Sequence, residues 1–245
     1  MKVFCAYNHE YDRFLKSVVD YILCKFGDDL ELKNIEEIEL VKELENKNSD
    51  GRYQGNRIVL AERLYRSLPC LDISQVENSE AFKGIVGTLY HEMGHATDMV
   101  RMPKLYNDVF KAFEAEDISV DLYAVYLFLE YVAERRSSVI HTKEHDEYCM
   151  AVESGSWNRY KNAPVEMAFL LMSKILVYYI VRKYAACDFK SCFGKNKLVA
   201  EYVEDLSEAL NCTYSELPFD DKEKCSAVKN VMERYMLAFV EEYAR

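Results

Sequence analysis

Residues that interrupt helices are scarce in this chain, which has only eight glycines and four prolines among its 245 residues. Long stretches instead repeat apolar residues at helical spacing, so we expect a mostly α-helical protein. The clearest helical patterns cover residues 10–27, 119–139, 164–186, 197–210 and 222–243.

No apolar run is long enough to cross a bilayer. The longest, AFLLMSKILVYYIV at residues 168–181, contains Lys174 and predicts a buried helix. An excess of positive charge is also missing, because the net charge is −11. This acidic balance argues against nucleic acid and against an anionic membrane surface as the main partner.

Cysteines in the spacing of many metal sites are absent, since none of the eight cysteines forms a C-x-x-C pattern. The opening segment MKVFCAYNHEYDRF turns polar at Asn8, too early for the apolar region of an export signal. We therefore expect a cytoplasmic protein whose cysteines are reduced and pack as small buried side chains.

The chain does contain enough apolar material for a substantial core, since half of its residues are apolar and 13% are aromatic. We expect an α+β fold that is mostly α-helical. No linker is evident, so we treat residues 1–245 as a single unit. Its strands and first long helices should lie in about 1–100, and about 101–245 should be helical.

The strand signals are confined to the first part of the chain. IEEIELV fits either a strand or a helix, whereas NRIVLAE has the β-branched core of a short strand. Asp50 and Gly51 lie between the two runs and give a turn signal. We therefore expect a small β-element, a hairpin, before residue 65.

Two of the five histidines lie four residues apart in TLYHEMGHATD, residues 88–98. On a helix, His91 and His95 occupy one face, and each can direct a ring nitrogen at the same metal ion. Glu92 lies about 100° around the helix, where it can reach a water molecule on that metal. This H-E-x-x-H arrangement predicts zinc, with Glu92 as the general base.

The helix that contains this motif has predictable ends. Ser74 or Ser79 can cap its first turn, and Met102-Pro103 marks the latest position at which it ends. The alternative to a metal site is an amphipathic helix with two partly exposed histidines.

A catalytic zinc ion binds three protein ligands and keeps one position open. The extended pattern H-E-x-x-H-x-x-G-x-x-H is absent, because Asp98 and Arg101 occupy its glycine and final histidine positions. We therefore expect a carboxylate further along the chain. The candidates are Glu114, Glu116, Asp117, Asp121, Glu130 and Glu134.

Glu130 is the favoured ligand because it follows the apolar run LYAVYLFL. An ionised carboxylate in a buried helix needs a cation or a proton, and zinc would supply the charge. Glu134 lies one turn on and could accept a hydrogen bond from a ligand histidine. Two alternatives remain: Glu134 is itself the ligand, or both glutamates lie on a solvated edge and pair with Arg135 and Arg136.

HEMGH followed by EYVAE resembles the gluzincin metallopeptidases, in which an E-x-x-x-D motif follows the first motif. The resemblance covers about residues 51–138. It implies a zincin-like catalytic core with His91, His95 and Glu130 as zinc ligands and Glu92 as the base. Glu134, where the family usually has Asp, would orient a histidine.

Two further elements follow from the resemblance. GRYQGNRIVLAERL is similar to the edge strand that pairs with the substrate backbone in zincins. Gluzincins usually add a Tyr or His that donates to the developing oxyanion. His141, His145 and Tyr160 are candidates for that role by position alone.

The sequence thus predicts a zinc-dependent metallopeptidase that hydrolyses peptide bonds in a peptide or protein substrate. One alternative is a metallopeptidase-like regulatory or binding protein that holds zinc but has little general proteolytic activity. Another is a helical interaction protein without a metal.

Overall fold

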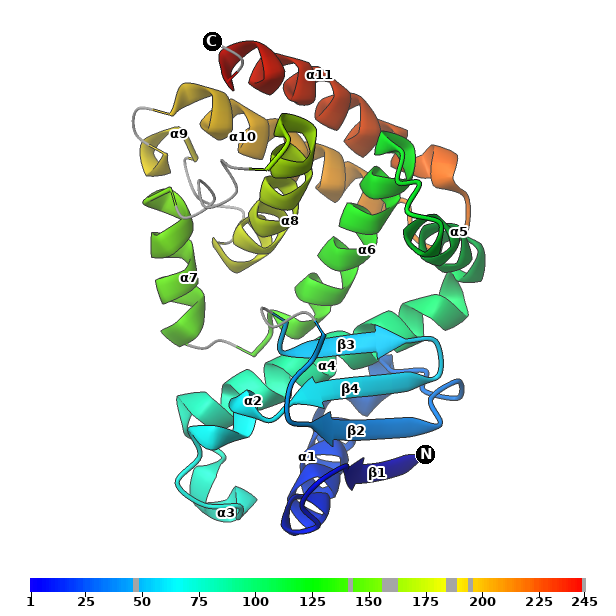
Figure 1. The fold of residues 1–245 in the computed structure, drawn as a ribbon, viewed down its shortest axis with the longest axis vertical. Coiled ribbons are helices and arrows are strands. Elements are labelled where there is room, and N and C mark those ends of the chain that lie inside the picture. The colour runs from blue at the N-terminus through cyan, green and yellow to red at the C-terminus, as the bar shows by residue number, and fades with distance from the viewer. Residues whose placement is uncertain (46–48, 141–142, 156–162, 184–188, 194–195, 244–245) are drawn as a thin grey trace. The chain divides into compact units, whose positions relative to one another are not determined.

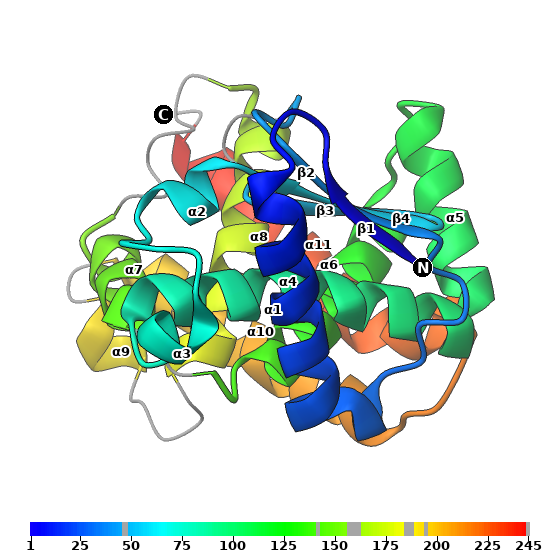
Figure 2. The same ribbon diagram turned by 90° about the horizontal axis from the view of Figure 1, so that it is seen from below.

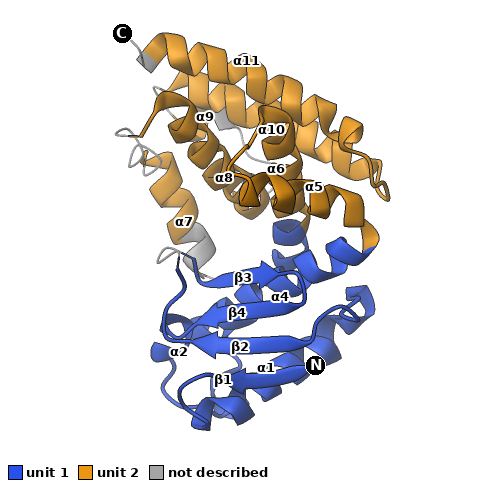
Figure 3. Cartoon of the chain, turned by 45° about the vertical axis from the view of Figure 1, so that its right-hand side comes forward, with its two compact units in different colours: residues 1–100, 133–144 blue, residues 101–132, 145–245 orange. Residues whose placement is uncertain are grey.

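The computed structural model describes residues 1–45, 49–140, 143–155, 163–183, 189–193 and 196–243, without the side chains of 143–146, 189–190 and 243. The chain divides into two compact units (Figure 3). Unit 1 comprises residues 1–100 and 133–144, and unit 2 comprises 101–132 and 145–245. One of the divisions falls within helix α6, Val120–Ser137, so this helix contributes to both units.

Unit 1 contains all the strands that the structure describes. Its elements are β1 (Lys2–Cys5), α1 (Glu10–Phe26), the 3-10 turn η1 (Gly27–Asp29), β2 (Glu37–Val41), β3 (Gly51–Gln54), β4 (Arg57–Ala61), α2 (Arg63–Arg66), α3 (Ile73–Val76) and α4 (Glu80–Arg101).

Unit 2 is helical throughout its described part. Its elements are α5 (Pro103–Glu114), the first part of α6, α7 (Lys143–Glu153), α8 (Val165–Lys183), α9 (Phe189–Cys192), α10 (Lys197–Ser215), the 3-10 turn η3 (Lys222–Cys225) and α11 (Ser226–Tyr243). The prediction of a mostly helical α+β protein with a small N-terminal β-element is confirmed. The zincin-like core and the single catalytic unit over residues 1–245 stay predictions.

The four-stranded sheet has the order β1-β2-β4-β3 (Figure 1). β2 is parallel to both β1 and β4, and its pairing with β4 places Ile38 beside Ile58 and Leu40 beside Leu60. All four of these side chains are buried. Within the described part of the chain, β3 pairs only with β4 and forms one edge of the sheet.

The predicted hairpin is wrong in its strands and in its turn. The runs on either side of Asp50 and Gly51 form β2 and β4, which are parallel. The hairpin instead joins β3 to β4 through Gly55 and Asn56, and Gly55 has a positive φ of 62°. Glycine adopts this backbone conformation without the steric cost that a side chain imposes.

α1 crosses α4 within unit 1 (Figure 2). The crossing is aromatic: Phe14 and Tyr21 of α1 contact Phe82 of α4 edge-on, and Phe26 stacks on Tyr90 with ring centroids 4.9 Å apart. Such contacts bury large apolar area and fix ring geometry. They anchor α4, the helix that contains the HEMGH motif.

The core of unit 2 forms where α8, α10 and α11 meet. Phe169 of α8 contacts Tyr202 of α10 and Phe239 of α11, and the Ser173 hydroxyl lies 2.6 Å from the Tyr202 hydroxyl. α6 joins this core through Tyr131, whose hydroxyl donates to Asn211 at 2.8 Å. α8 is therefore held from several sides.

The structure also bears on two further predictions, one about membrane-spanning helices and one about the cysteines. None of the helices that the structure describes is both long and apolar enough to cross a membrane. The expectation that the cysteines pack as small buried side chains does not hold for Cys24 and Cys212, which are exposed. Cys5, Cys149 and Cys225 are buried.

Candidate metal centre

The burial of helix α4 increases along its length. Ser79 begins it, since its hydroxyl accepts from the Phe82 backbone N–H at 3.2 Å. Its first turns bury one apolar face, as an amphipathic helix does. From His91 to Asp98, every residue is buried, including polar ones. Buried polar groups need partners, so this half of α4 is where a site is expected.

The two histidines of α4 face each other. The Nε2 atoms of His91 and His95 lie 3.0 Å apart, and the rings are nearly perpendicular, at 86°. Both residues are only 9% exposed. The i,i+4 spacing therefore brings two imidazole nitrogens to one point inside the protein rather than onto a solvated helix face.

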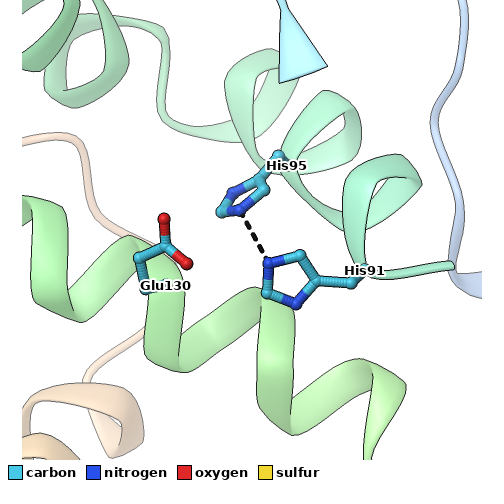
Figure 4. A group of neighbouring side chains, drawn as sticks. All are labelled: His91, His95 and Glu130. Atoms are coloured by element: carbon cyan, nitrogen blue, oxygen red, sulfur yellow. Dashed lines mark hydrogen bonds between the residues drawn. The ribbon is translucent and has the colours of Figure 1, made fainter. Parts of the chain in front are cut away.

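Glu130 completes a group with these histidines (Figure 4). One ligand atom from each of His91, His95 and Glu130 lies within 4.8 Å of the others. Glu130 is 5% exposed and belongs to α6. This is the only such group of three His, Cys, Asp or Glu side chains among the described residues.

Glu134 lies one helical turn after Glu130 and contacts the other side of a histidine. Its Oε2 atom is 3.1 Å from Nδ1 of His91, and its side chain is buried. A carboxylate at Nδ1 favours the proton on that nitrogen, which leaves Nε2 with a lone pair for a metal.

Glu130 has other partners besides the histidines. Lys174 of α8 donates to its Oε1 at 3.0 Å, and the Tyr178 hydroxyl donates to its Oε2. Lys174 also donates to the Tyr126 hydroxyl. The negative charge that was expected to need a metal thus already has a cation beside it, and a metal ion would share Glu130 with Lys174.

Glu92 is 6% exposed and lies against the start of β3. A Cβ atom on Gly51 would lie 2.9 Å from both Cγ and Oε1 of Glu92. Real side chains essentially never approach so closely, so the glycine lets the edge-strand backbone pass directly beside the carboxylate. This contact joins the predicted base to the predicted edge strand within unit 1.

A buried ion pair joins α4 to the end of α6. Arg136 donates to both oxygens of Asp98, at 2.9 and 2.6 Å, and the Asp98 side chain is 2% exposed. Gly94 makes room for this pair, because a Cβ atom there would lie 2.8 Å from Nη1 of Arg136. Arg136 lies two residues after Glu134, and its two parallel hydrogen bonds to Asp98 fix α6 against α4 at that point.

The other carboxylates considered as ligands lie elsewhere. Glu114, Glu116 and Asp117 are exposed, and Asp121 pairs with Lys229 at 2.7 Å. The alternative in which both glutamates lie on a solvated edge and pair with Arg135 and Arg136 does not match the structure. Both glutamates are buried, and Arg136 pairs with Asp98.

The suggested oxyanion donors cannot be placed. His141 and Tyr160 lie outside the described residues, and so does the side chain of His145.

The residues of this centre fit a divalent metal ion such as zinc. Two imidazole nitrogens and one carboxylate are the donor set of a catalytic zinc site. With zinc–nitrogen bonds of about 2.0–2.1 Å, two ligand nitrogens in a tetrahedron lie about 3.3 Å apart. The observed separation of 3.0 Å is close to that value.

Comparison with protein-family models, with curated proteins and with solved structures gives no match. The chemistry proposed for this centre therefore rests on its own residues.

Sequence reasoning missed several neighbours of the centre. Lys174 gave a signal, as the charge within an otherwise apolar run, but its partner Glu130 is 44 residues away. Asp98 and Arg136 gave none, because two charged residues in separate helices do not reveal that they pair. Gly51 was taken for a turn residue, whereas its small size serves the contact with Glu92.

Proposed function

We propose that this chain is a zinc-dependent metallopeptidase of the gluzincin type, with His91, His95 and Glu130 as ligands. One observation supports this above all: two buried histidine nitrogens lie 3.0 Å apart and form a group with a buried carboxylate. Because no family model matches the chain, the gluzincin assignment rests on the HEMGH and EYVAE motifs alone.

In this proposal, Glu92 is the general base. Zinc, when bound, would lower the pKa of a water molecule and polarise the carbonyl of the substrate. Glu92 accepts the proton of the attacking water and passes it to the leaving amine. Its burial beside Gly51 holds the carboxylate in one place, which a positioned base requires.

The substrate in this proposal is a peptide or protein chain that extends the sheet at β3. Among the strands that the structure describes, β3 is an edge strand paired with β4 alone, and its first residue lies against Glu92. A peptide that added a strand there would have its backbone held by main-chain hydrogen bonds beside the base. The cytoplasmic location and the absence of nucleic acid and membrane partners stay predictions.

Glu92→Gln tests the mechanism. The amide keeps the shape of the side chain but cannot accept the proton, so we expect about 10²–10⁴-fold lower kcat/KM on a peptide library. Zinc content should not change. Glu80→Gln, in the half-exposed first turn of the same helix, is the matched control and should keep full activity. Full activity in Glu92→Gln would refute the mechanism.

The regulatory alternative has one observation in its favour, namely that Lys174 and Tyr178 already hold both oxygens of Glu130. A protein of that kind would contain zinc, cleave no general substrate and bind one specific partner.

Metal removal tests whether the chain is instead a metal-free interaction protein. If zinc binds the folded state, a chelator should lower the melting temperature, and added zinc should restore it. A purified protein with no zinc and no change in melting temperature on chelation would contradict both zinc-dependent functions.

A further inference from the structure

A cavity of about 110 Å³ lies within unit 1, at the ends of two parallel strands. β2 and β4 run in the same direction, so their carboxyl ends meet at one edge of the sheet, beside α2 (Figure 1). The lining comes from the segments that follow β2 and precede β3, from the end of β4 and from α2. Ligands commonly bind at this edge of sheets with parallel strands.

The lining of this cavity is positively charged, although the net charge of the chain is −11. Three of the lining side chains are basic, namely Lys42, Arg63 and Arg66, and Glu43 is the acidic one. The lining side chains therefore carry a net charge of +2. A concave site with this charge attracts an anion rather than a cation.

The two arginines are held in position by carboxylates that are not part of the lining. Arg63 pairs with Asp50 at 2.5 Å, and Arg66 pairs with Glu62 at 2.9 Å. The pair between Arg66 and Glu62 uses one nitrogen, Nη2, of a guanidinium that has five N–H donors. An anion in the cavity would therefore share the arginines with these carboxylates and would not have to displace them.

Lys42 has no carboxylate partner among the residues that the structure describes. Its ammonium lies 5.6 Å from the centroid of the Tyr7 ring. A cation–π contact of this kind holds the ammonium in place without neutralising it. Lys42 and Arg66 are both exposed, so an anion can reach them from solution.

The size and the charge of the cavity define the class of anion. One water molecule needs about 10–15 Å³ of a cavity, so 110 Å³ admits a small oxyanion or the charged end of a larger molecule. The planar fork of an arginine matches the oxygens of a phosphate, and a lysine binds the same group as a point charge. A phosphate dianion also balances the charge of the lining.

We propose that this cavity binds a phosphate group, with Lys42 and Arg66 as its main contacts and Arg63 beside them. The group is either free phosphate or the end of a small organic phosphate, because both present the same oxygens. All the residues involved belong to unit 1, and the inference depends neither on the metal centre nor on the proposed peptidase function.

Isothermal titration calorimetry on the full chain, as purified, tests the site. The probes are inorganic phosphate and phenyl phosphate, each compared with sodium chloride of the same ionic strength. Saturable binding of inorganic phosphate alone assigns the site to the free ion, whereas binding of phenyl phosphate assigns it to organic phosphates. Acetate has one negative charge and two oxygens, so it should bind at least about tenfold more weakly.

Variants identify the residues that bind the anion. Lys42→Met and Arg66→Met should each weaken phosphate binding by about tenfold or more, because each removes a charge-assisted hydrogen bond. Both positions are exposed, so both variants should fold, and their melting temperatures check this. Lys33→Met is the matched control. Lys33 is also exposed but precedes β2, at the other end of that strand, so this variant should bind phosphate as the unaltered protein does.

Three results would overturn the site. The first is phosphate binding that is unchanged in Lys42→Met and Arg66→Met, which would place the anion elsewhere, for example on a metal ion at the metal centre. The second is the absence of any binding heat beyond that of sodium chloride. The third is acetate bound as tightly as phosphate. None of these results affects the proposed peptidase function, which the Glu92→Gln variant tests separately.

Discussion

Helices α4 and α6 both bury charged side chains in the second half of their length, but they do so in different surroundings. α4 begins as an amphipathic helix and becomes fully buried only from His91 to Asp98. α6 is buried on all sides from Tyr123 to Glu134, except at Tyr126. Its two glutamates are therefore isolated acids in an apolar helix, whereas the polar residues of α4 stand next to one another.

This difference explains how readily each helix can be interpreted. The i,i+4 histidines of α4 form a local pattern whose geometry follows from the helix alone. The acids of α6 form no comparable pattern, because their partners come from elsewhere in the chain. Glu134 contacts His91, and Glu130 contacts Lys174. Burial in α6 identifies two important carboxylates but does not assign their roles.

The largest expected effect is on zinc affinity, and it distinguishes Glu130 from Glu134. Glu130→Gln should abolish zinc binding at stoichiometric concentrations, because it removes a charged ligand. Glu134→Gln should weaken zinc binding by about 10–100-fold, as loss of a histidine-orienting group does. Competition with a coloured chelator measures both affinities.

The control for this pair is the melting temperature of each metal-free protein, since Glu130→Gln also removes a charged partner of Lys174. A greater loss of zinc affinity in Glu134→Gln would reverse the two roles and make Glu134 the ligand.

The next effect concerns the pair that joins α4 to α6. Arg136→Met leaves Asp98 buried without its cation, which should lower the free energy of unfolding by about 3–5 kcal/mol. Urea denaturation measures this change. Arg135→Met is the control on the same helix, because Arg135 is exposed, and it should change the free energy of unfolding by less than about 0.5 kcal/mol. Similar values for the two variants would contradict a structural role for the Arg136–Asp98 pair.

The smallest effect tests the contact between β3 and α4. In Gly51→Ala, the new methyl group would lie 2.9 Å from the Glu92 carboxylate and must displace it. We expect about 10–100-fold lower kcat/KM, because a small misplacement of a catalytic group is costly. Gly87→Ala is the control, since its Cβ would meet nothing within 4 Å. Unchanged activity in Gly51→Ala would mean that Glu92 does not act where it lies.

Local signals predicted much of the fold. The periodicity of apolar residues located α1, α6, α8, α10 and α11, because helical spacing depends only on near neighbours. β1 was missed, because its four residues are defined by parallel pairing with β2, more than thirty positions away. Asp50-Gly51 and Gly55-Asn56 are both adequate turn signals, and only the pairing of the strands decides between them.

In the candidate site, too, some residues can be predicted from local sequence, whereas others depend on tertiary packing. His91, Glu92 and His95 follow from one short motif, and the burial of Glu130 and Glu134 follows from the apolar run before them. The partners of Glu130 do not follow, because Lys174 and Tyr178 reach it through tertiary packing, and the pairing of Arg136 with Asp98 does not follow either. A sequence lists charged residues but does not say which of them meet.

The continuity of α6 has a consequence for how this protein can vary. Glu130 and Glu134 are one turn apart, so the helix fixes both their spacing, about 6 Å along its axis, and their direction. A single inserted or deleted residue between them would rotate one acid by about 100° relative to the other. Related chains should therefore keep the number of residues between these two acids unchanged, whereas the exposed loops can grow or shrink.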